Sequence, residues 1–251
     1  MGSRCELLRF RDEIAFTEPK STEKTFPMSF FDMREPSGKK CMTETTAEYW
    51  NRYYGTRTSP VPNIPSQFAA FVALEVTEDS TIVDVGCGSG RDSLFFANAG
   101  FNVLGIDASE AAISLCRRTA QERGISRAGF LCCNVDDPGL SGKIAAATTG
   151  RVVVYARFFL HAIPEEAELA FLEATAALPN IDLLAIEFRT NRDAQQTKVT
   201  GSHYRRFIPP LDFLHRAAKF GFSPVYFTEG FGYAKYRNDD AHIARVLMRR
   251  A

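Results

Sequence analysis

Three closely spaced glycines and two acids form the most informative pattern in this sequence of 251 residues. Gly86, Gly88 and Gly90 follow an apolar run and precede a segment with a helical pattern. Glycine lets the backbone adopt positive φ angles and approach a ligand closely, and a helix behind such a loop presents free N–H groups. Asp84 lies just before the loop. Asp107 ends the next apolar run, where a carboxylate can bind two ribose hydroxyls.

The spacing of these residues distinguishes between two classes of nucleotide cofactor. A dinucleotide-binding loop has the pattern G-x-G-x-x-G, whereas Arg91 stands here where the third glycine of that pattern would be. In addition, Asp84 lies two residues before the first glycine. A carboxylate at that point opposes a pyrophosphate and favours a sulfonium or an ammonium group. The pattern therefore predicts an adenosyl amino acid as the cofactor rather than NAD.

Strand-like and helix-like segments alternate along the rest of the sequence. Seven apolar segments predict strands, at residues 81–85, 101–106, 130–135, 151–156, 181–188, 223–228 and 242–248. Helices are expected at residues 47–54, 68–75, 92–99, 109–124, from Pro164 onward and at 210–221. This alternation predicts an α/β fold with a doubly wound, mostly parallel seven-stranded sheet and helices on both faces. Ligands of such sheets bind at the carboxyl ends of the strands.

Composition and charge argue against several other classes of protein. The chain has 30 basic and 30 acidic residues, so no global field favours nucleic acid or an anionic membrane. It lacks the run of about 18 apolar residues that a membrane span needs. Its six cysteines and four histidines lack the spacing of a metal site. We therefore expect a soluble, cytoplasmic protein without a metal or membrane insertion, of undetermined oligomeric state.

Residues 1–45 differ from the remainder of the chain. A polar stretch is followed there by aromatic residues among Pro27, Pro36 and Gly38. This pattern predicts an N-terminal extension that is partly flexible or lid-like. Residues 46–251 then form the main domain.

Two segments carry a resemblance to a known family. Residues 83–90, with the sequence VDVGCGSG, and residues 105–109, with the sequence GIDAS, resemble the first two motifs of the class I S-adenosylmethionine-dependent methyltransferases. The resemblance covers roughly residues 47 to 250 and implies a Rossmann-like methyltransferase fold with S-adenosylmethionine as the cofactor. It implies that the loop, including Cys87, holds the methionine part. It also implies that Asp107 and Ala108 hold the ribose, and that Asn134 and Val135 face the adenine.

Four further segments resemble a narrower group. They are residues 50–54, 90–97, 157–163 and 204–208, which are similar to methyltransferases of bacterial capsule and surface-polysaccharide biosynthesis. The thiopurine methyltransferase-like group shares the aromatic segment before the first strand. These resemblances imply a small-molecule or glycan acceptor.

Arg157 and His161 follow the fourth predicted strand, which in this fold abuts the transferred methyl group. A histidine near an alcohol acceptor could remove its proton, because its side chain titrates near neutrality. The alternative is a histidine packed on the following helix. Arg157 is predicted to bind the cofactor carboxylate.

The connection after the fifth predicted strand is long and basic. Its candidate acceptor-binding residues are Arg189, His203, Tyr204, Arg205 and Arg206. Arginine offers paired donors to a carboxylate or phosphate, so this insert could recognise an anionic acceptor. The alternative is a solvated basic loop that pairs with surface acids.

Aromatic residues near the start of the domain have two interpretations as well. Trp50 could cover the cofactor, because aromatic faces suit a sulfonium, and Tyr54 is a candidate acceptor contact. Packing of one helical face is the alternative for both residues.

Four functions are compatible with these features to different degrees. A small-molecule or sugar methyltransferase that acts on oxygen fits best, with nitrogen or sulfur as alternative acceptor atoms. Zero net charge weighs against a nucleic-acid methyltransferase. The intact loop and Asp107 weigh against a scaffold protein that has lost the cofactor, although a non-catalytic protein that binds it stays an alternative. Arg91 weighs against a nicotinamide oxidoreductase.

Overall fold

A computed structural model describes residues 45–194, 204–235 and 239–251 of the chain. The predicted N-terminal extension, apart from its last residue, and His203 lie outside these ranges. Among the helices that the structure describes, none has the length and apolar character that crossing a bilayer requires.

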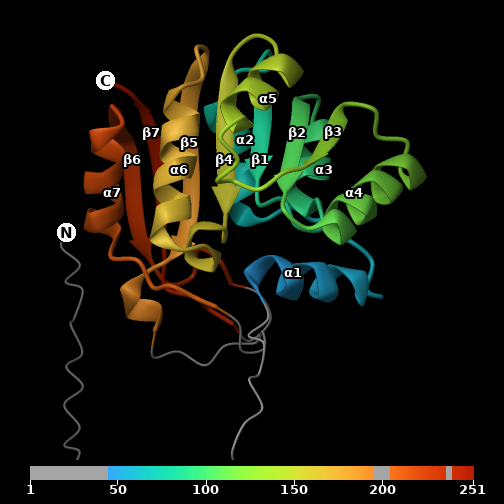
Figure 1. Ribbon diagram of the computed structural model, residues 1–251, viewed down its shortest axis with the longest axis horizontal. Helices are drawn as coiled ribbons and strands as arrows, with labels where there is room; N and C mark the ends of the chain where they lie inside the picture. The colour runs from blue at the N-terminus through green and yellow to red at the C-terminus, as the bar shows by residue number, and fades with distance from the viewer. Residues whose placement is uncertain (1–44, 195–203, 236–238) are drawn as a thin grey trace, which may run out of the picture. The chain divides into compact units, whose positions relative to one another are not determined.

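The seven expected strands form one sheet with the order β3-β2-β1-β4-β5-β7-β6 (Figure 1). Their bounds are β1 Thr81–Val85, β2 Asn102–Asp107, β3 Ala128–Cys132, β4 Val152–Arg157, β5 Ile181–Arg189, β6 Phe222–Gly230 and β7 Ile243–Arg250. The first five strands are parallel, whereas β7 runs antiparallel to both β5 and β6. The predicted doubly wound, mostly parallel sheet is confirmed.

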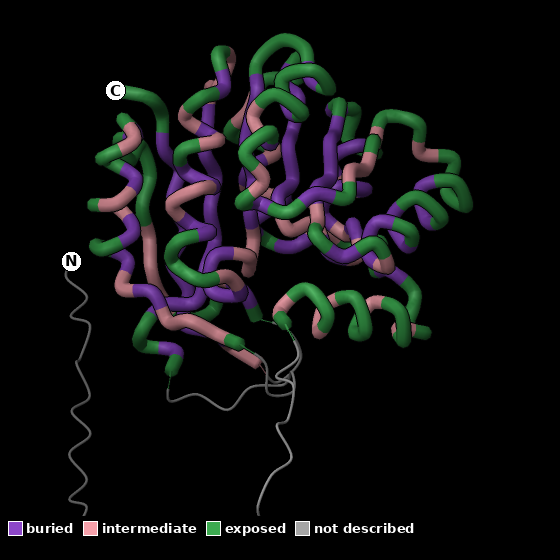
Figure 2. The backbone as a smooth tube through the Cα atoms, in the orientation of Figure 1, coloured by how far each residue is buried: buried purple, intermediate pink, exposed green. Residues whose placement is uncertain are grey.

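Helices cover both faces of this sheet. On one face, α5 (Leu140–Ala147), α6 (Glu165–Ala176) and α7 (Pro210–Lys219) pack on the strands through a single apolar cluster. On the other face, α2 (Gln67–Glu75) and α3 (Arg91–Asn98) share a second cluster with the sheet. Leu115 on α4 (Glu110–Glu122) packs with Leu94 on α3. The central strands are consequently buried along their length (Figure 2), as the continuous apolar runs of β1 and β4 require.

Local signals explain where several helices begin. Ser109 caps α4 by accepting a hydrogen bond from the amide of Ala112, and Thr45 forms a reciprocal capping box with Glu48 at α1 (Thr46–Gly55). Pro164 is the N-cap residue of α6 rather than part of its first turn.

Two elements differ from the sequence-based expectation. The third strand ends at Cys132, although the apolar run continues to the buried residues Cys133 and Val135 in the connection that follows. The helix α5 was not expected. Its N-cap residue, Gly139, provides no side-chain cap, and the helix buries only Leu140 and Ile144, so its local sequence signal is weak.

Candidate functional site

The glycine loop connects β1 to α3 at the carboxyl edge of the sheet. Gly86, Gly88 and Gly90 have φ angles of 72°, 55° and 75°. A Cβ atom added to Gly86 would overlap the Phe159 ring, and one added to Gly88 would overlap the Tyr54 hydroxyl. Both the positive φ angles and the close approaches require glycine. The absence of side chains at Gly86 and Gly88 therefore lets Phe159 and Tyr54 pack directly on the loop backbone.

Hydrogen bonds hold this loop on its neighbours. The amides of Gly86 and Cys87 donate to the carbonyl of Ile106 on β2, at 2.8 and 3.1 Å. The thiol of Cys116 on α4 donates to the carbonyl of Gly88 at 3.2 Å. Helix α3 begins after Gly90 and has no side-chain cap, so the positive end of its dipole can act on a ligand in the loop.

Asp84 on β1 is a buried acid with one strong hydrogen bond. Its side chain has 3% exposure, and the hydroxyl of Ser93 on α3 donates to Oδ2 at 2.5 Å. Burial raises the pKa of Asp84 to about 7, against the effect of the Ser93 hydrogen bond, and the charges of Asp92 and Asp107 add to the rise. A cationic ligand group nearby would favour the ionised form.

Asp107 connects the loop to the start of α4. Its Oδ2 accepts a hydrogen bond from the amide of Gly88, and its Oδ1 accepts one from the amide of Ser109, both at 2.9 Å. Burial raises the pKa of Asp107, although these two backbone hydrogen bonds oppose that effect. Each carboxylate oxygen has a further lone pair, which can accept from a ribose hydroxyl.

The predicted adenine contacts lie next to this acid. The amide of Cys133, just after β3, donates to the carbonyl of Asp107 at 3.0 Å. Asn134 follows as an exposed residue, and its Oδ1 accepts from the amide of Val135 at 3.1 Å. The thiol of Cys132 donates to the carbonyl of Ala108 at 3.6 Å. The structure thus brings the two predicted contact regions together.

Helix α1 lies across the carboxyl edge of the sheet (Figure 1) and carries several aromatic residues. None of its residues is buried (Figure 2). The rings of Trp50 and Tyr54 stack at 6.0 Å. Although the Tyr54 side chain as a whole is half-buried, its hydroxyl is desolvated, and this, followed by the charge of Asp107, raises the pKa of Tyr54 well above its ordinary value. The hydroxyl of Tyr54 lies against Gly88 in the glycine loop, and its predicted contact with the acceptor stays a prediction.

Arg157, at the end of β4, is held by a buried acid. Its Nε donates to Oε1 of Glu187 on β5 at 2.8 Å, and Nε of Arg245 on β7 donates to Oε2 at 2.7 Å. The Arg157 guanidinium also lies over the Phe158 ring, 4.2 Å from its centroid. Phe158 has a φ of 54°, a strained conformation that is frequent at functional sites.

His161 lies in a short 3-10 helix, Leu160–Ala162, and is buried. Its ring meets the Phe158 ring edge to face at 5.5 Å, and its carbonyl accepts a hydrogen bond from the amide of Arg206 at 2.7 Å. The Phe158 ring is thus contacted by both His161 and Arg157. The role of His161 as a base stays a prediction.

The basic residues of the insert have acidic partners within the fold. Arg189 donates to Asp193 at 2.7 Å and to Asp239 at 2.5 Å, and Arg206 pairs with Glu168 on α6. An acceptor bound by Arg189 or Arg206 would have to compete with these acidic side chains for the guanidinium group. Of the other candidates, Tyr204 is 49% exposed. Burial and the charge of Arg189 lower the pKa of Arg205.

Several residues at this edge were not singled out as site residues from the sequence. Ser93 binds Asp84, Phe159 covers Gly86, and Arg245 shares Glu187 with Arg157. Glu187 stands at the end of a predicted strand, and this position is a sequence signal for a site residue. Ser93, Phe159 and Arg245 carry no such signal.

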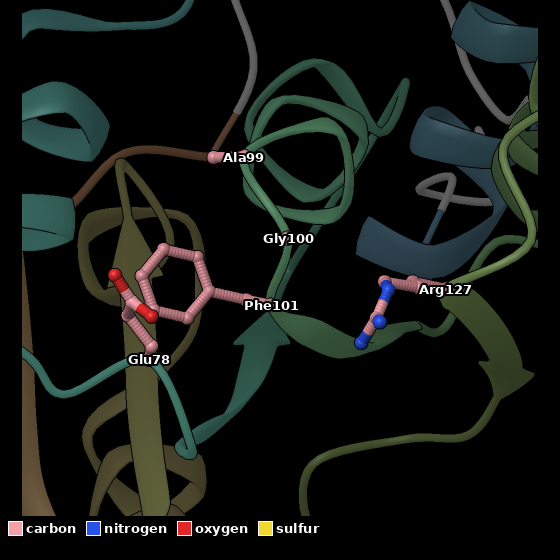
Figure 3. Close-up of a pocket in the computed structure, with 5 residues that line it drawn as sticks. All are labelled: Glu78, Ala99, Gly100, Phe101 and Arg127. Carbon is pink, nitrogen blue, oxygen red and sulfur yellow. The ribbon is translucent and has the colours of Figure 1, made fainter.

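A cavity of about 350 Å³ lies away from this edge. Its lining residues are Glu78, Ala99, Gly100, Phe101 and Arg127 (Figure 3). All of them precede β1, β2 or β3 in the chain. The cavity therefore lies at the amino ends of the strands, opposite the glycine loop.

Comparison with known proteins agrees with this geometry. Residues 82–180 match a family model described as a methyltransferase domain, and this segment contains the glycine loop and Asp107. This segment of the chain is therefore similar to methyltransferase domains. A curated relative, the 2-heptyl-1-hydroxyquinolin-4(1H)-one methyltransferase of Mycobacteroides abscessus, is 26% identical over 125 residues, which are 49% of this chain and 51% of the relative. The match spans about half the length of that relative.

Solved structures of methyltransferases share the fold of this chain. An S-adenosylmethionine-dependent methyltransferase from Anabaena variabilis superposes with a TM-score of 0.63 at 16% identity, over 82% of this chain and 93% of its own. The magnesium protoporphyrin IX methyltransferase of Synechocystis PCC 6803, with S-adenosylmethionine bound, superposes with a TM-score of 0.54 at 18% identity. That match covers 86% of this chain and 87% of the other.

Proposed function

We propose that the protein transfers the methyl group of S-adenosylmethionine to a small-molecule acceptor. The observation that carries this proposal is the combination of a buried acid with three positive-φ glycines and a second acid on the next strand. A sulfonium and an ammonium suit the environment of Asp84. The matched methyltransferase family and the cofactor-bound structural neighbour support the same cofactor.

The residues of the site fit this cofactor. Asp84 and the loop from Gly86 to Gly90 would hold the methionine part, Asp107 the ribose, and Asn134 with Val135 the adenine. Trp50 and Tyr54 on α1 would cover it. When bound, the sulfonium supplies an activated methyl group. The protein contributes alignment for an in-line displacement and excludes water.

For the acceptor, we propose an anionic small molecule or sugar that is methylated on oxygen. In this proposal His161 accepts the proton of a hydroxyl near the end of β4, and Arg205 contributes positive charge to the acceptor site. The M. abscessus relative is named for a small molecule that contains a hydroxyl group, which supports this acceptor class.

Calorimetric titration tests the cofactor assignment directly. We expect S-adenosylmethionine and S-adenosylhomocysteine to bind at micromolar concentrations, and NAD not to bind. Binding of NAD in preference to both adenosyl ligands would overturn the proposal. Cofactor binding without methyl transfer to any acid, phenol or sugar in a screen with radiolabelled cofactor would favour a non-catalytic binding protein.

Arg205→Glu tests recognition of an anionic acceptor. We expect the KM for an acceptor found in that screen to rise about tenfold or more, because reversal replaces attraction with repulsion. The Kd of S-adenosylhomocysteine should change less than threefold. Arg118→Glu is the control, because Arg118 lies exposed on α4. Equal changes in KM and Kd would contradict this role.

Asn51→Ala tests whether α1 covers the cofactor. Oδ1 of Asn51 accepts from the Ser109 hydroxyl at 3.2 Å and from the Ala111 amide at 3.0 Å, which anchors α1 on α4. Loss of both hydrogen bonds should weaken cofactor binding about tenfold and accelerate proteolysis between residues 56 and 65. Asn98→Ala, at an exposed position on α3, should change neither. Unchanged proteolysis in Asn51→Ala would show that this anchor is dispensable.

A further inference from the structure

Glu187 is a buried acid near the carboxyl end of β5, and both of its carboxylate oxygens accept hydrogen bonds. Its side chain has 0% exposure. Oε1 accepts from Nε of Arg157 at 2.8 Å, and Oε2 accepts from Nε of Arg245 at 2.7 Å. Because a buried carboxylate held by two arginines has little freedom to move, Glu187 fixes the guanidinium groups on both neighbouring strands.

Arg157 uses only part of its hydrogen-bonding capacity in this arrangement. Among the described residues, its side-chain hydrogen bonds go through Nε alone, and the Phe158 ring supports the face of its guanidinium. The Arg157 side chain retains 16% exposure. Its two terminal nitrogens are therefore oriented by the protein and available to an anion.

The position of Arg157 places these nitrogens near the glycine loop. Strand β4 pairs with β1 in a register that sets Tyr155 opposite Asp84. Arg157, two residues further along, is therefore level with Gly86. Phe159, two residues beyond Arg157, contacts Gly86 itself. An anionic group in the loop would face both Arg157 and the positive end of α3.

We propose that Glu187 is a positioning residue, which directs the Arg157 guanidinium at the carboxylate of bound S-adenosylmethionine. This inference rests on the proposed function. Asp84 would then stabilise the positive groups of the methionine part while Arg157 binds its negative group. The two charges of one zwitterion would thus be recognised from adjacent strands, and the acid on β5 would set the geometry of the second contact.

A pair of ligands that differ in this carboxylate tests the proposal. S-Adenosylmethionine should bind the wild-type protein roughly ten- to hundredfold more tightly than decarboxylated S-adenosylmethionine, as a charged hydrogen-bonded pair implies. In Glu187→Gln this ratio should fall below about threefold, because a neutral amide holds a guanidinium less firmly. Arg157→Lys should give the same fall, because lysine keeps the charge but lacks the planar fork.

Glu168→Gln is a matched control for the loss of a buried acid. Glu168 also has 0% exposure and pairs with two arginines, Arg206 and Arg216, but it lies on α6. We expect a comparable loss of thermal stability with an unchanged ratio of the two affinities. A ratio near one in the wild-type protein, or a wild-type ratio in folded Glu187→Gln or in Arg157→Lys, would overturn the inference. Failure of both ligands to bind the wild-type protein would instead overturn the proposed function.

Discussion

Asp84→Asn should stabilise the ligand-free protein at pH 8 and at the same time abolish tight cofactor binding. The carboxylate is buried, and its pKa of about 7 lies well above the ordinary value of 3.8. Each unit of such a shift corresponds to about 1.4 kcal/mol. Removing the buried charge should therefore raise the melting temperature at pH 8 by about 5 °C or more.

The sign of this effect depends on pH. Between pH 3.8 and about 7 the folded protein binds more protons at Asp84 than the unfolded chain does. The free energy of unfolding consequently falls as the pH rises through this range, and the full cost of the charge is present above about pH 7. At pH 5 the folded wild-type side chain is mostly neutral, so the advantage of the asparagine variant should be much smaller there.

The affinity for the cofactor should depend on pH in the opposite direction to the stability of the ligand-free protein. A sulfonium or ammonium beside Asp84 lowers its pKa, so binding at pH 7 should release a proton, and affinity should rise from pH 6 to pH 8. Calorimetry in buffers of different ionisation enthalpy measures this release. The asparagine variant should bind about a hundredfold more weakly, without releasing that proton. A variant that binds the cofactor normally would remove Asp84 from the site.

Gly86→Ala should abolish cofactor binding, because an added Cβ atom cannot be accommodated in the loop. The φ of 72° is unfavourable for alanine, and the added Cβ would overlap the ring and approach Cβ of Phe159, which has little room to move close to its own backbone. Together the two effects should cost about 2–4 kcal/mol of stability. We expect cofactor binding to be lost in calorimetry even at temperatures where the variant remains folded.

Gly124→Ala separates the two contributions. Gly124 has a similar φ of 64°, but a Cβ there would meet no atom within 4 Å. This control should lose only the conformational part, about 1–2 kcal/mol, and should bind the cofactor as the wild-type protein does. If Gly86→Ala bound equally well, the loop would not contact the cofactor closely.

The parts of the fold that could be predicted are those with local signals. The glycine loop, Asp107 and the cap at Ser109 depend on neighbouring residues, and the continuous apolar runs of the central strands identify buried parallel strands. The weakly amphipathic helix α5 escaped prediction because Gly139 and Gly142 interrupt its pattern. The end of β3 was misplaced because buried apolar residues continue past the last hydrogen-bonded pair.

Ion-pair partners could not be predicted because many of them are far apart in the sequence. Arg189 lies 50 residues from Asp239, and Arg206 lies 38 residues from Glu168. Sequence spacing shows that the insert is basic but not which acids of the fold neutralise it. Tyr54 likewise meets Gly88 across a long sequence separation, from a helix whose Asn51 is hydrogen-bonded to the start of α4. Contacts between distant segments follow from the packed sheet and become visible only in three dimensions.

The reversed direction of β7 has a practical consequence. This strand starts at Ile243, beside Arg189 at the site, and runs back toward the amino ends of its parallel neighbours. The amide of Ala251 donates to the carbonyl of Gly221, at the start of the neighbouring strand β6. A linker, affinity tag or surface attachment joined after Ala251 would therefore leave from the edge remote from the cofactor loop, so immobilised protein should bind its ligands as freely as protein in solution.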